Sequence, residues 1–344
     1  MSSTSHRWKM FLTLLTFLAL VGTAYALRQQ LTETFQNLRN ANPWPILLII
    51  PLAITNHYFQ GKLYQGLFRI FGDRFRTKSM MRLSLELNLI NNVFPSGGVS
   101  GFSYLSIRMK GEGITTGKAT FIQMMRFTML FVSFQLLLGL GLLFLAFGGD
   151  ANNFVMLVAG SLATLLLVST AGIAYLIGSQ QRIQSFSTWL TTFINRLIQI
   201  IRPKHPETIN IEKAKRALTE LHESYLKIRN DLSELKKPLI FATMISLAEI
   251  AAIYSVFVAF GYYINPGAIT IAYAVANFAG IVSVLPGGVG IYEGLMTGVF
   301  AAAGVPAAVS LPVVVAFRVM SMLIQLPVGY FFYQRALRTK PASH

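Results

Sequence analysis

Long apolar runs separated by polar linkers make up most of the chain. Several of them exceed the roughly 20 residues that a helix needs to cross about 30 Å of hydrocarbon. Lipid cannot satisfy backbone polar groups, so these runs must be helical, and they lack the alternation of β-barrel strands. The pattern predicts an all-α, multi-pass integral membrane protein. The apolar runs cover residues 10–27, 46–59, 120–147, 154–177, 238–264, 268–285 and 311–332.

The composition excludes a water-soluble globular protein. Hydrophobic residues account for 53% of the 344 residues and charged residues for only 12%, about half of the roughly 25% found in soluble chains. The absence of cysteine excludes disulfides and thiol chemistry. Residues 10–26 also resemble a signal peptide, with small residues at Ala24 and Ala26. Cleavage there would leave the remaining topology unchanged.

The basic residues lie almost entirely in alternate linkers. The chain has 29 Lys and Arg against 13 Asp and Glu, a formal charge of +16, which in a soluble protein would favour nucleic-acid binding. Here the cations crowd both termini and the linkers 60–82, 108–118 and 179–237, whereas the loops around Gly149 and Pro266 carry none. The positive-inside rule therefore predicts a cell inner-membrane protein with both termini cytoplasmic. Anionic lipid, and no nucleic acid, is the expected partner of this charge.

Two similar Pro-Gly motifs predict an inverted repeat. Pro95-Ser-Gly-Gly-Val-Ser-Gly101 and Pro286-Gly-Gly-Val-Gly290 each interrupt a weakly hydrophobic helical pair, and a long span with an arginine follows each. The charge pattern makes the first pair begin and end inside and the second begin and end outside, as in many transporters. The alternative is that these residues only permit kinks or close helix packing. The expected helix-break residues are Pro95, Gly97, Gly98, Gly101, Pro286, Gly287, Gly288 and Gly290.

The chain is predicted to form one transmembrane domain over residues 1–344, with repeat one at about 43–147 and repeat two at about 238–334. The polar segment between them, at about 180–237, has apolar residues spaced by three and four, which predicts a cytoplasmic pair of amphipathic helices. Residues 211–235 could join a homo-oligomer or contact a partner as a coiled coil. A helical hairpin lying on the membrane explains the same spacing.

Ionisable residues inside the apolar segments are candidates for function, because charge in hydrocarbon is costly. Arg126 and Arg318 lie in the spans that follow the two motifs, and arginine grips phosphate with two parallel hydrogen bonds. If each broken helix restarts after its Gly-Gly, its positive N-terminal end points inward as well. Both features suit an anionic lipid headgroup. The alternative is that these arginines neutralise Glu249 and Glu293 as ion pairs. The candidate headgroup-binding residues are Asn91, Asn92, Arg126, Glu249, Asn277, Glu293 and Arg318.

The sequence offers no catalytic constellation. It has no His-Glu-x-x-His motif, no Ser nucleophile with a nearby base, and no carboxylate cluster that would hold a metal. We therefore expect no catalytic residues, no metal and no cofactor.

The segments Asn91-Asn-Val-Phe-Pro-Ser-Gly-Gly-Val-Ser-Gly101 and Leu285-Pro-Gly-Gly-Val-Gly-Ile-Tyr-Glu-Gly294 resemble the lysylphosphatidylglycerol synthase transmembrane (flippase-like) family. This family includes the membrane half of the multiple peptide resistance factor, and the resemblance covers about residues 43–335. It implies a role in moving lipids between leaflets, among them aminoacylated phosphatidylglycerol, and relatives are linked to polyprenyl-phosphate or hopanoid lipids. No soluble aminoacyl-transferase domain follows the last span, so lipid lysinylation is not expected. The motif positions that the resemblance implies are Asn92, Pro95, Gly98, Arg126, Pro286, Gly287, Gly288, Gly290, Glu293 and Arg318.

The sequence as a whole predicts a flippase-like lipid translocase. Its substrate would be a membrane lipid, either an anionic or aminoacylated phospholipid or a polyprenyl-phosphate-type lipid, whose headgroup crosses a polar cavity between the repeats. A membrane-embedded lipid-modifying enzyme and a non-transporting membrane scaffold are the alternatives.

Overall fold

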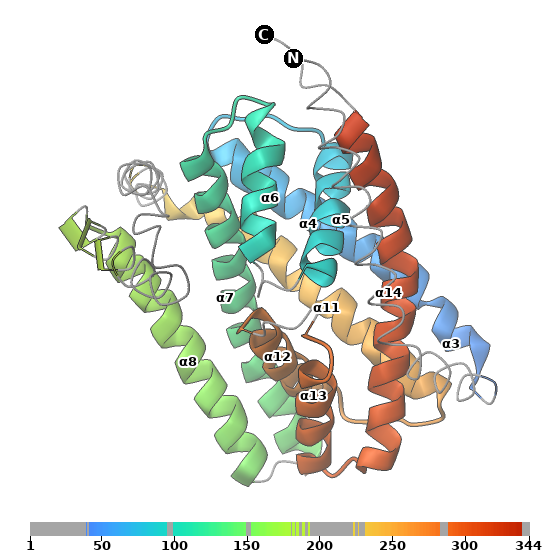
Figure 1. The fold of residues 1–344 in the computed structure, drawn as a ribbon. Coiled ribbons are helices and arrows are strands. Elements are labelled where there is room, and N and C mark those ends of the chain that lie inside the picture. Colours follow the sequence, from blue (N-terminus) through green and yellow to red (C-terminus); the bar gives the residue numbers. More distant parts are fainter. Residues whose placement is uncertain are drawn as a thin grey trace, which may run out of the picture.

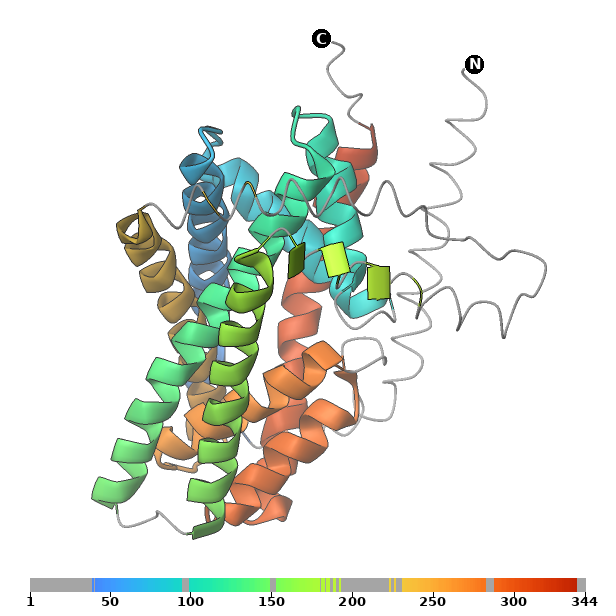
Figure 2. The same cartoon turned by 90° about the vertical axis from the view of Figure 1, so that its left-hand side faces the viewer.

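The computed structural model describes Arg39 and residues 41–94, 99–148, 153–179, 231–282 and 288–338, with isolated positions between 181 and 226. These residues form a bundle of helices and contain no strand (Figures 1 and 2). The prediction of an all-α membrane protein is confirmed. The predicted first span and signal-like segment lie outside the described residues, as does most of the predicted helix pair at 180–237.

Five long helices form the frame of the bundle. Four of these helices, α7, α8, α11 and α14, each contain a segment that is long and apolar enough to cross a membrane. The fifth, α4, is comparable in length but carries Asn56, His57 and Gln60 on its buried side. A short helix α3 (Pro43–Leu47) precedes α4, and a 3-10 turn η1 (Leu232–Leu235) precedes α11. The long helices are α4 (Ile49–Ile70), α7 (Thr116–Gly148), α8 (Asn153–Ile177), α11 (Lys236–Ala259) and α14 (Ala307–Arg338).

Two pairs of short helices enter this frame from opposite ends. Helices α5 (Thr77–Val93) and α6 (Val99–Lys110) lie in the upper half of the bundle, and α12 (Pro266–Val282) and α13 (Ile291–Ala302) lie in the lower half (Figures 1 and 2). In both pairs the second helix starts near mid-height and runs outward. The described helices α5 and α12 end at Val93 and Val282, and α6 and α13 begin at Val99 and Ile291. A two-fold relation between the repeats stays a prediction.

Charge separates the two ends of the bundle. The linkers after α4 and α6, the start of α11 and the end of α14 lie toward the upper end in Figure 1, and they carry most of the described linker cations, whereas Arg39 precedes α3. At the other end of α11, Tyr262 and Tyr263 are exposed, and so is Trp44 of α3, the helix that follows Asn42, whose N–H bonds to Ala259 O at 2.8 Å. Exposed Trp and Tyr are typical of membrane–water interfaces. The cytoplasmic assignment of the basic end stays a prediction.

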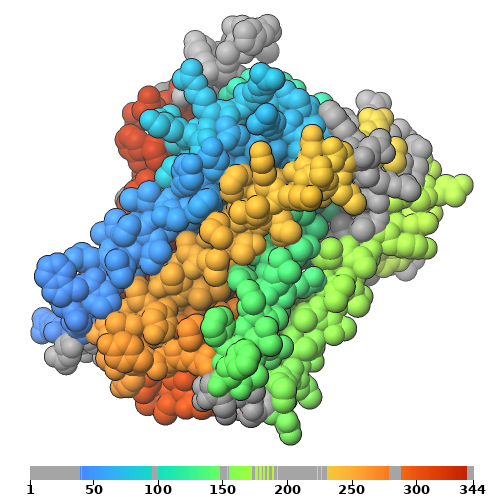
Figure 3. Space-filling model, turned by 180° about the vertical axis from the view of Figure 1, so that it is seen from behind, coloured from blue at the N-terminus to red at the C-terminus, as the bar shows by residue number. Residues whose placement is uncertain are grey.

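The buried core is built mainly from aliphatic and aromatic side chains of the long helices and the lower pair. One cluster joins the helices α7, α8, α11, α12, α13 and α14. In it the rings of Phe257 and Phe300 meet edge to face, with their centroids 5.0 Å apart. A second joins α4, α5 and α6 to α7 and α11. Seen from behind, α4 and α11 lie side by side across the whole face (Figure 3). This α4–α11 contact brings together two helices with polar residues at mid-length.

Gly329 allows α14 to pack closely on α5. A methyl group there would lie 2.7 Å from the backbone oxygen of Leu85, and small residues are what permit such close approach of membrane helices. Gly329→Ala should therefore destabilise the protein by about 1–3 kcal/mol, measured by thermal unfolding in detergent. Gly139→Ala is the control, since nothing lies within 4 Å of its added methyl. Equal stability of the two variants would contradict this packing.

Candidate functional site: a polar network inside the bundle

Glu293 and Arg318 form a buried ion pair between α13 and α14. Arg318 Nη1 lies 2.7 Å from Glu293 Oε1, and the two side chains are only 9% and 6% exposed. The other carboxylate oxygen, Oε2, accepts a hydrogen bond from Gly290 N–H at 2.7 Å. The guanidinium also lies 4.7 Å from the ring centroid of Tyr292. The pair therefore fixes the start of α13 against α14, so the ion-pair alternative is correct for these two residues.

Glycine is required where α13 begins. Gly288 and Gly290 have φ values of +65° and +85°, a conformation that residues with a side chain rarely adopt. In the upper pair, Gly101 serves another purpose, because a Cβ there would lie 2.6 Å from Asn91 Oδ1. Gly101 thus lets α6 pack on the Asn91 side chain of α5. The other expected helix-break residues, Pro95, Gly97, Gly98, Pro286 and Gly287, lie outside the described residues.

Arg126 on α7 has no carboxylate partner among the described residues. Its Nη2 donates a long hydrogen bond of 3.4 Å to Gln60 Oε1. Its Nε is buried and has no hydrogen-bond acceptor in the described part of the chain. The guanidinium carbon lies 5.5 Å and 5.4 Å from the ring centroids of Tyr64 and Phe127. This cation is held by neutral groups and keeps donor capacity to spare.

Two amides connect Arg126 to Glu249. Gln60 Nε2 donates to Asn56 Oδ1 at 2.7 Å, and Asn56 Nδ2 donates to Glu249 Oε1 at 3.0 Å. Asn56 Nδ2 also donates to Ile245 O at 3.2 Å, and because a carbonyl only accepts, this contact fixes the orientation of the amide. The direct Arg126–Glu249 ion pair of the alternative interpretation is therefore not formed. We call Arg126, Gln60, Asn56 and Glu249 the amide relay.

A second network ties α5 to α14 through His57 on α4. Gln325 Oε1 accepts from Asn88 Nδ2 at 2.8 Å and lies 3.2 Å from His57 Nε2. The other ring nitrogen, Nδ1, lies 3.1 Å from Ser84 Oγ. Asn92 joins this network through its amide, which donates to Asn88 Oδ1 at 2.8 Å. Asn92 therefore positions Asn88 within the His57 network and makes no described contact with the relay.

A small cavity lies between the two networks. It has a volume of about 10 Å³, which is room for about one water molecule. Asn56 and Glu249 of the relay line it together with Ser321 and Gln325 of α14. Because Gln325 also belongs to the His57 network, the cavity is where the two networks meet.

The remaining candidate residues have local roles. Asn277 on α12 donates to Tyr273 O at 2.9 Å and hydrogen-bonds the side chain of Tyr292. Asn91 contacts α6 through Gly101, and Ser100 Oγ lies 3.5 Å from its Oδ1. The structure thus joins Arg126 with Glu249 and Glu293 with Arg318. Asn91 and Asn277 are not drawn into the relay by any described contact.

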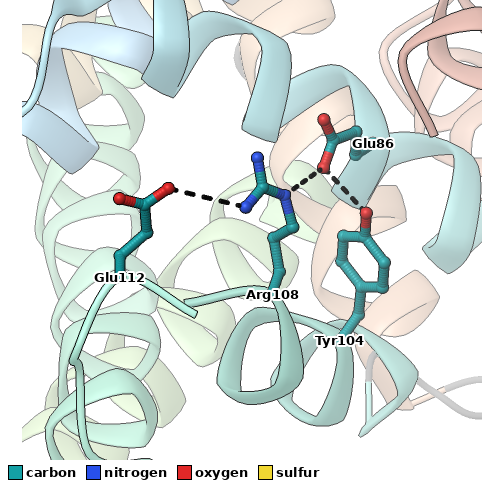
Figure 4. Close-up of polar contacts among 4 residues, drawn as sticks. All are labelled: Glu86, Tyr104, Arg108 and Glu112. Carbon is teal, nitrogen blue, oxygen red and sulfur yellow. Dashed lines mark hydrogen bonds and ion pairs between the residues drawn. The ribbon is translucent and has the colours of Figure 1, made fainter. Parts of the chain in front are cut away.

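A separate charged cluster locks α6 onto α5 (Figure 4). Glu86 is 3% exposed, accepts a hydrogen bond from Tyr104 at 2.7 Å and lies 3.4 Å from Arg108 Nε. Arg108 Nη1 also lies 3.8 Å from Glu112 Oε1. The buried carboxylate is therefore already neutralised, and this cluster is structural.

Sequence reasoning missed the polar face of α4. It treated the segment 46–59 as apolar and, apart from charged residues, considered only asparagines close to the Pro-Gly motifs, so Asn56, His57 and Gln60 were left out. All three are at most 9% exposed. The available signal was the i, i+4 spacing of Asn56 and Gln60 beside a histidine in an apolar run.

Comparison with known proteins fits this architecture. The sequence model of the protein family described as the lysylphosphatidylglycerol synthase TM region matches residues 10–329. The chain belongs to this family. A UPF0104 membrane protein of Methanocaldococcus jannaschii is 24% identical over 329 residues, which cover 93% of this chain and 90% of that protein.

Further similar proteins come from another organism. A UPF0104 membrane protein of Methanothermobacter thermautotrophicus is 25% identical over 242 residues, 67% of this chain and 68% of that protein. A 32% identical match to a UPF0104 membrane protein of the same organism covers 108 residues, 31% of this chain and 32% of the relative. Membership of the lysylphosphatidylglycerol synthase TM family places the chain among membrane proteins with a lipid-related function.

Proposed function

We propose that the protein translocates a lipid with an anionic headgroup between membrane leaflets and that Arg126 binds the headgroup. The observation that carries this proposal is the state of Arg126, a cation inside the bundle with a buried, unsatisfied Nε and no carboxylate partner among the described residues. A charge in that position is costly unless it is balanced. A phosphate offers both the negative charge and the acceptor oxygens that the guanidinium lacks.

The helix pairs support the same headgroup chemistry. The N-terminal ends of α6 and α13 point toward mid-height from opposite halves of the bundle (Figures 1 and 2). Each end carries a partial positive charge from the helix dipole, and broken helices use such ends to bind anionic groups in transporters. At α13 the carboxylate of Glu293 occupies part of this end by accepting from Gly290.

The proposed activity contains no covalent step. Arg126 provides charge and hydrogen bonds, the amide relay holds it in place, and the Glu293–Arg318 pair positions α13. The headgroup would cross within the bundle while the tails remain in lipid. An anionic or aminoacylated phospholipid and a polyprenyl-phosphate-type lipid share the phosphate that Arg126 would bind.

Leaflet exchange in reconstituted vesicles tests the proposal. Purified protein is placed in phosphatidylcholine vesicles with a trace of fluorescent phosphatidylglycerol, and a membrane-impermeant quencher reports the outward-facing label. Fluorescent phosphatidylcholine serves as the zwitterionic comparison. We expect exchange of the anionic lipid well above that of protein-free vesicles and of the zwitterionic lipid.

Two results would contradict translocation. If the label stays in its leaflet in protein vesicles as it does in empty ones, and polyprenyl phosphate also fails to exchange, the scaffold alternative is supported. If mass spectrometry shows that the lipid has been chemically changed, the enzyme alternative replaces transport.

A further inference from the structure

Glu249 is a carboxylate inside the bundle without a direct counter-ion. The ion pairs among the described residues engage Glu86, Glu112, Asp73 and Glu293, but not Glu249. It accepts one described hydrogen bond, from Asn56. An ionised carboxylate in hydrocarbon is stabilised only by a partner or by taking up a proton.

The position of Glu249 suits proton uptake. Glu249 lies roughly 20 Å along α11 from the first residue of the helix, Lys236, at a rise of about 1.5 Å per residue. This distance places Glu249 deep in the bundle. It also lines the cavity that holds about one water molecule. A space of this size can place a water molecule beside the carboxylate but cannot hold a lipid headgroup.

Of the two arginines inside the bundle, Arg126 is the one without a direct carboxylate partner among the described residues. Arg318 is neutralised by Glu293, and the remaining neighbours are uncharged tyrosines and a histidine that contacts Gln325 of the cavity wall. Helix α3 contributes no titratable residue. Tyr273 on α12 and Tyr292 on α13 interact electrostatically with Glu249. The other titratable groups buried in the surrounding helices are His57 on α4, which contacts Gln325, Arg126 on α7, which contacts Gln60, and Arg318 on α14, which pairs with Glu293.

We infer that Glu249 takes up a proton when an anionic headgroup binds Arg126, so that lipid and proton cross the membrane together. In the empty protein, the anionic group that Arg126 reaches is Glu249, and it does so only indirectly, through two amides. A bound phosphate takes over that role and leaves the carboxylate uncompensated. The proton then bonds to a Glu249 carboxylate oxygen and leaves again when the headgroup does.

This linkage deepens the proposed function and rests on it, because it assumes that Arg126 binds the headgroup. Linkage is reciprocal, so a headgroup that favours protonation of Glu249 must itself bind more tightly when Glu249 is protonated. Coupling between two sites commonly changes affinity by about fivefold or more. Acidification on one side should therefore drive anionic lipid away from that side.

The first test applies a pH gradient to the reconstituted vesicles. In the wild-type protein, net movement of fluorescent phosphatidylglycerol should follow the gradient and stop when an ionophore collapses it. Glu249→Gln carries a neutral amide of the same shape, and in this variant the ratio of net exchange with the gradient to exchange without it should fall to about one. Glu86→Gln is the matched control, since this buried carboxylate is balanced by Arg108 outside the relay, and it should keep the wild-type response.

The second test measures protons directly and needs no transport. Short-chain phosphatidylglycerol is added to the detergent-solubilised protein in weak buffer with a pH indicator. Wild-type protein should take up protons on binding, by up to about one per lipid, and Glu249→Gln should take up none.

The outcomes separate this inference from the proposed function. Lipid exchange that ignores the pH gradient in the wild type, or that follows a sodium gradient instead, would overturn proton linkage and leave translocation standing. Equal proton uptake by the wild type and Glu249→Gln would also overturn it. Absence of exchange for every lipid in the wild type would remove the proposed function and the linkage with it.

Discussion

Replacing Arg318 with methionine should destabilise the folded protein by about 3–5 kcal/mol, the range seen when one partner of a buried ion pair is removed. The substitution leaves the Glu293 carboxylate, 6% exposed, with the Gly290 N–H as its described donor. Methionine keeps much of the side-chain volume, so the loss measures charge more than packing. Thermal unfolding of the purified protein in detergent gives the difference.

Removing both charges should recover most of that loss. In Arg318→Met/Glu293→Gln no buried charge is left uncompensated, and replacing a whole buried pair is often nearly neutral. Arg82→Met is the control, because Arg82 lies exposed at the basic end over the Phe332 ring at 5.5 Å, and it should cost less than about 1 kcal/mol. Additive effects of Arg318→Met and Glu293→Gln would show that the pair does not act as a unit.

The sequence predicts the long, continuously apolar helices well. It predicts a helix less well when that helix is buried among its neighbours and carries polar residues. The segments at 120–147 and 311–332 fall within α7 and α14. The predicted segment 46–59 stops short, because α4 continues to Ile70. Beyond Phe59 the helix carries Gln60 and Lys62, so it no longer resembles a lipid-facing run. Its buried polar residues, Asn56, His57 and Gln60, instead face neighbouring helices, which hydropathy along one chain does not detect.

The ion pairs show the same limit more sharply. Two arginines and two glutamates could be paired in principle, and sequence alone gave no reason to treat them differently. The structure pairs Arg318 with Glu293 because Glu293 lies in the first turn of α13, facing α14. Between Arg126 and Glu249 it inserts Gln60 and Asn56 from α4, a helix distant in sequence from both. Which amide fills that gap depends on how α4 packs between α7 and α11.

Replacing Arg126 with lysine should lower lipid exchange by about tenfold or more, since a lost hydrogen bond to a charged group is worth about 1.5–3 kcal/mol. Lysine keeps the charge but loses the planar fork that binds two phosphate oxygens. Stability should change little, because no described ion pair is broken and the contact to Gln60 is long, at 3.4 Å. The vesicle assay with fluorescent phosphatidylglycerol gives the rate, and size-exclusion chromatography reports assembly.

The same substitution at two other arginines separates loss of headgroup binding from loss of stability. Arg82→Lys repeats the same substitution at the exposed basic end and should exchange lipid like the wild type. Arg318→Lys keeps a cation beside Glu293, so its main effect should be lower stability. Loss of exchange without loss of stability is therefore expected only at Arg126. If Arg126→Lys exchanges lipid normally, its spare donors do not bind the headgroup. If it loses stability as Arg318→Lys does, Arg126 holds the bundle together and the balance between Arg126 and Glu249 is structural.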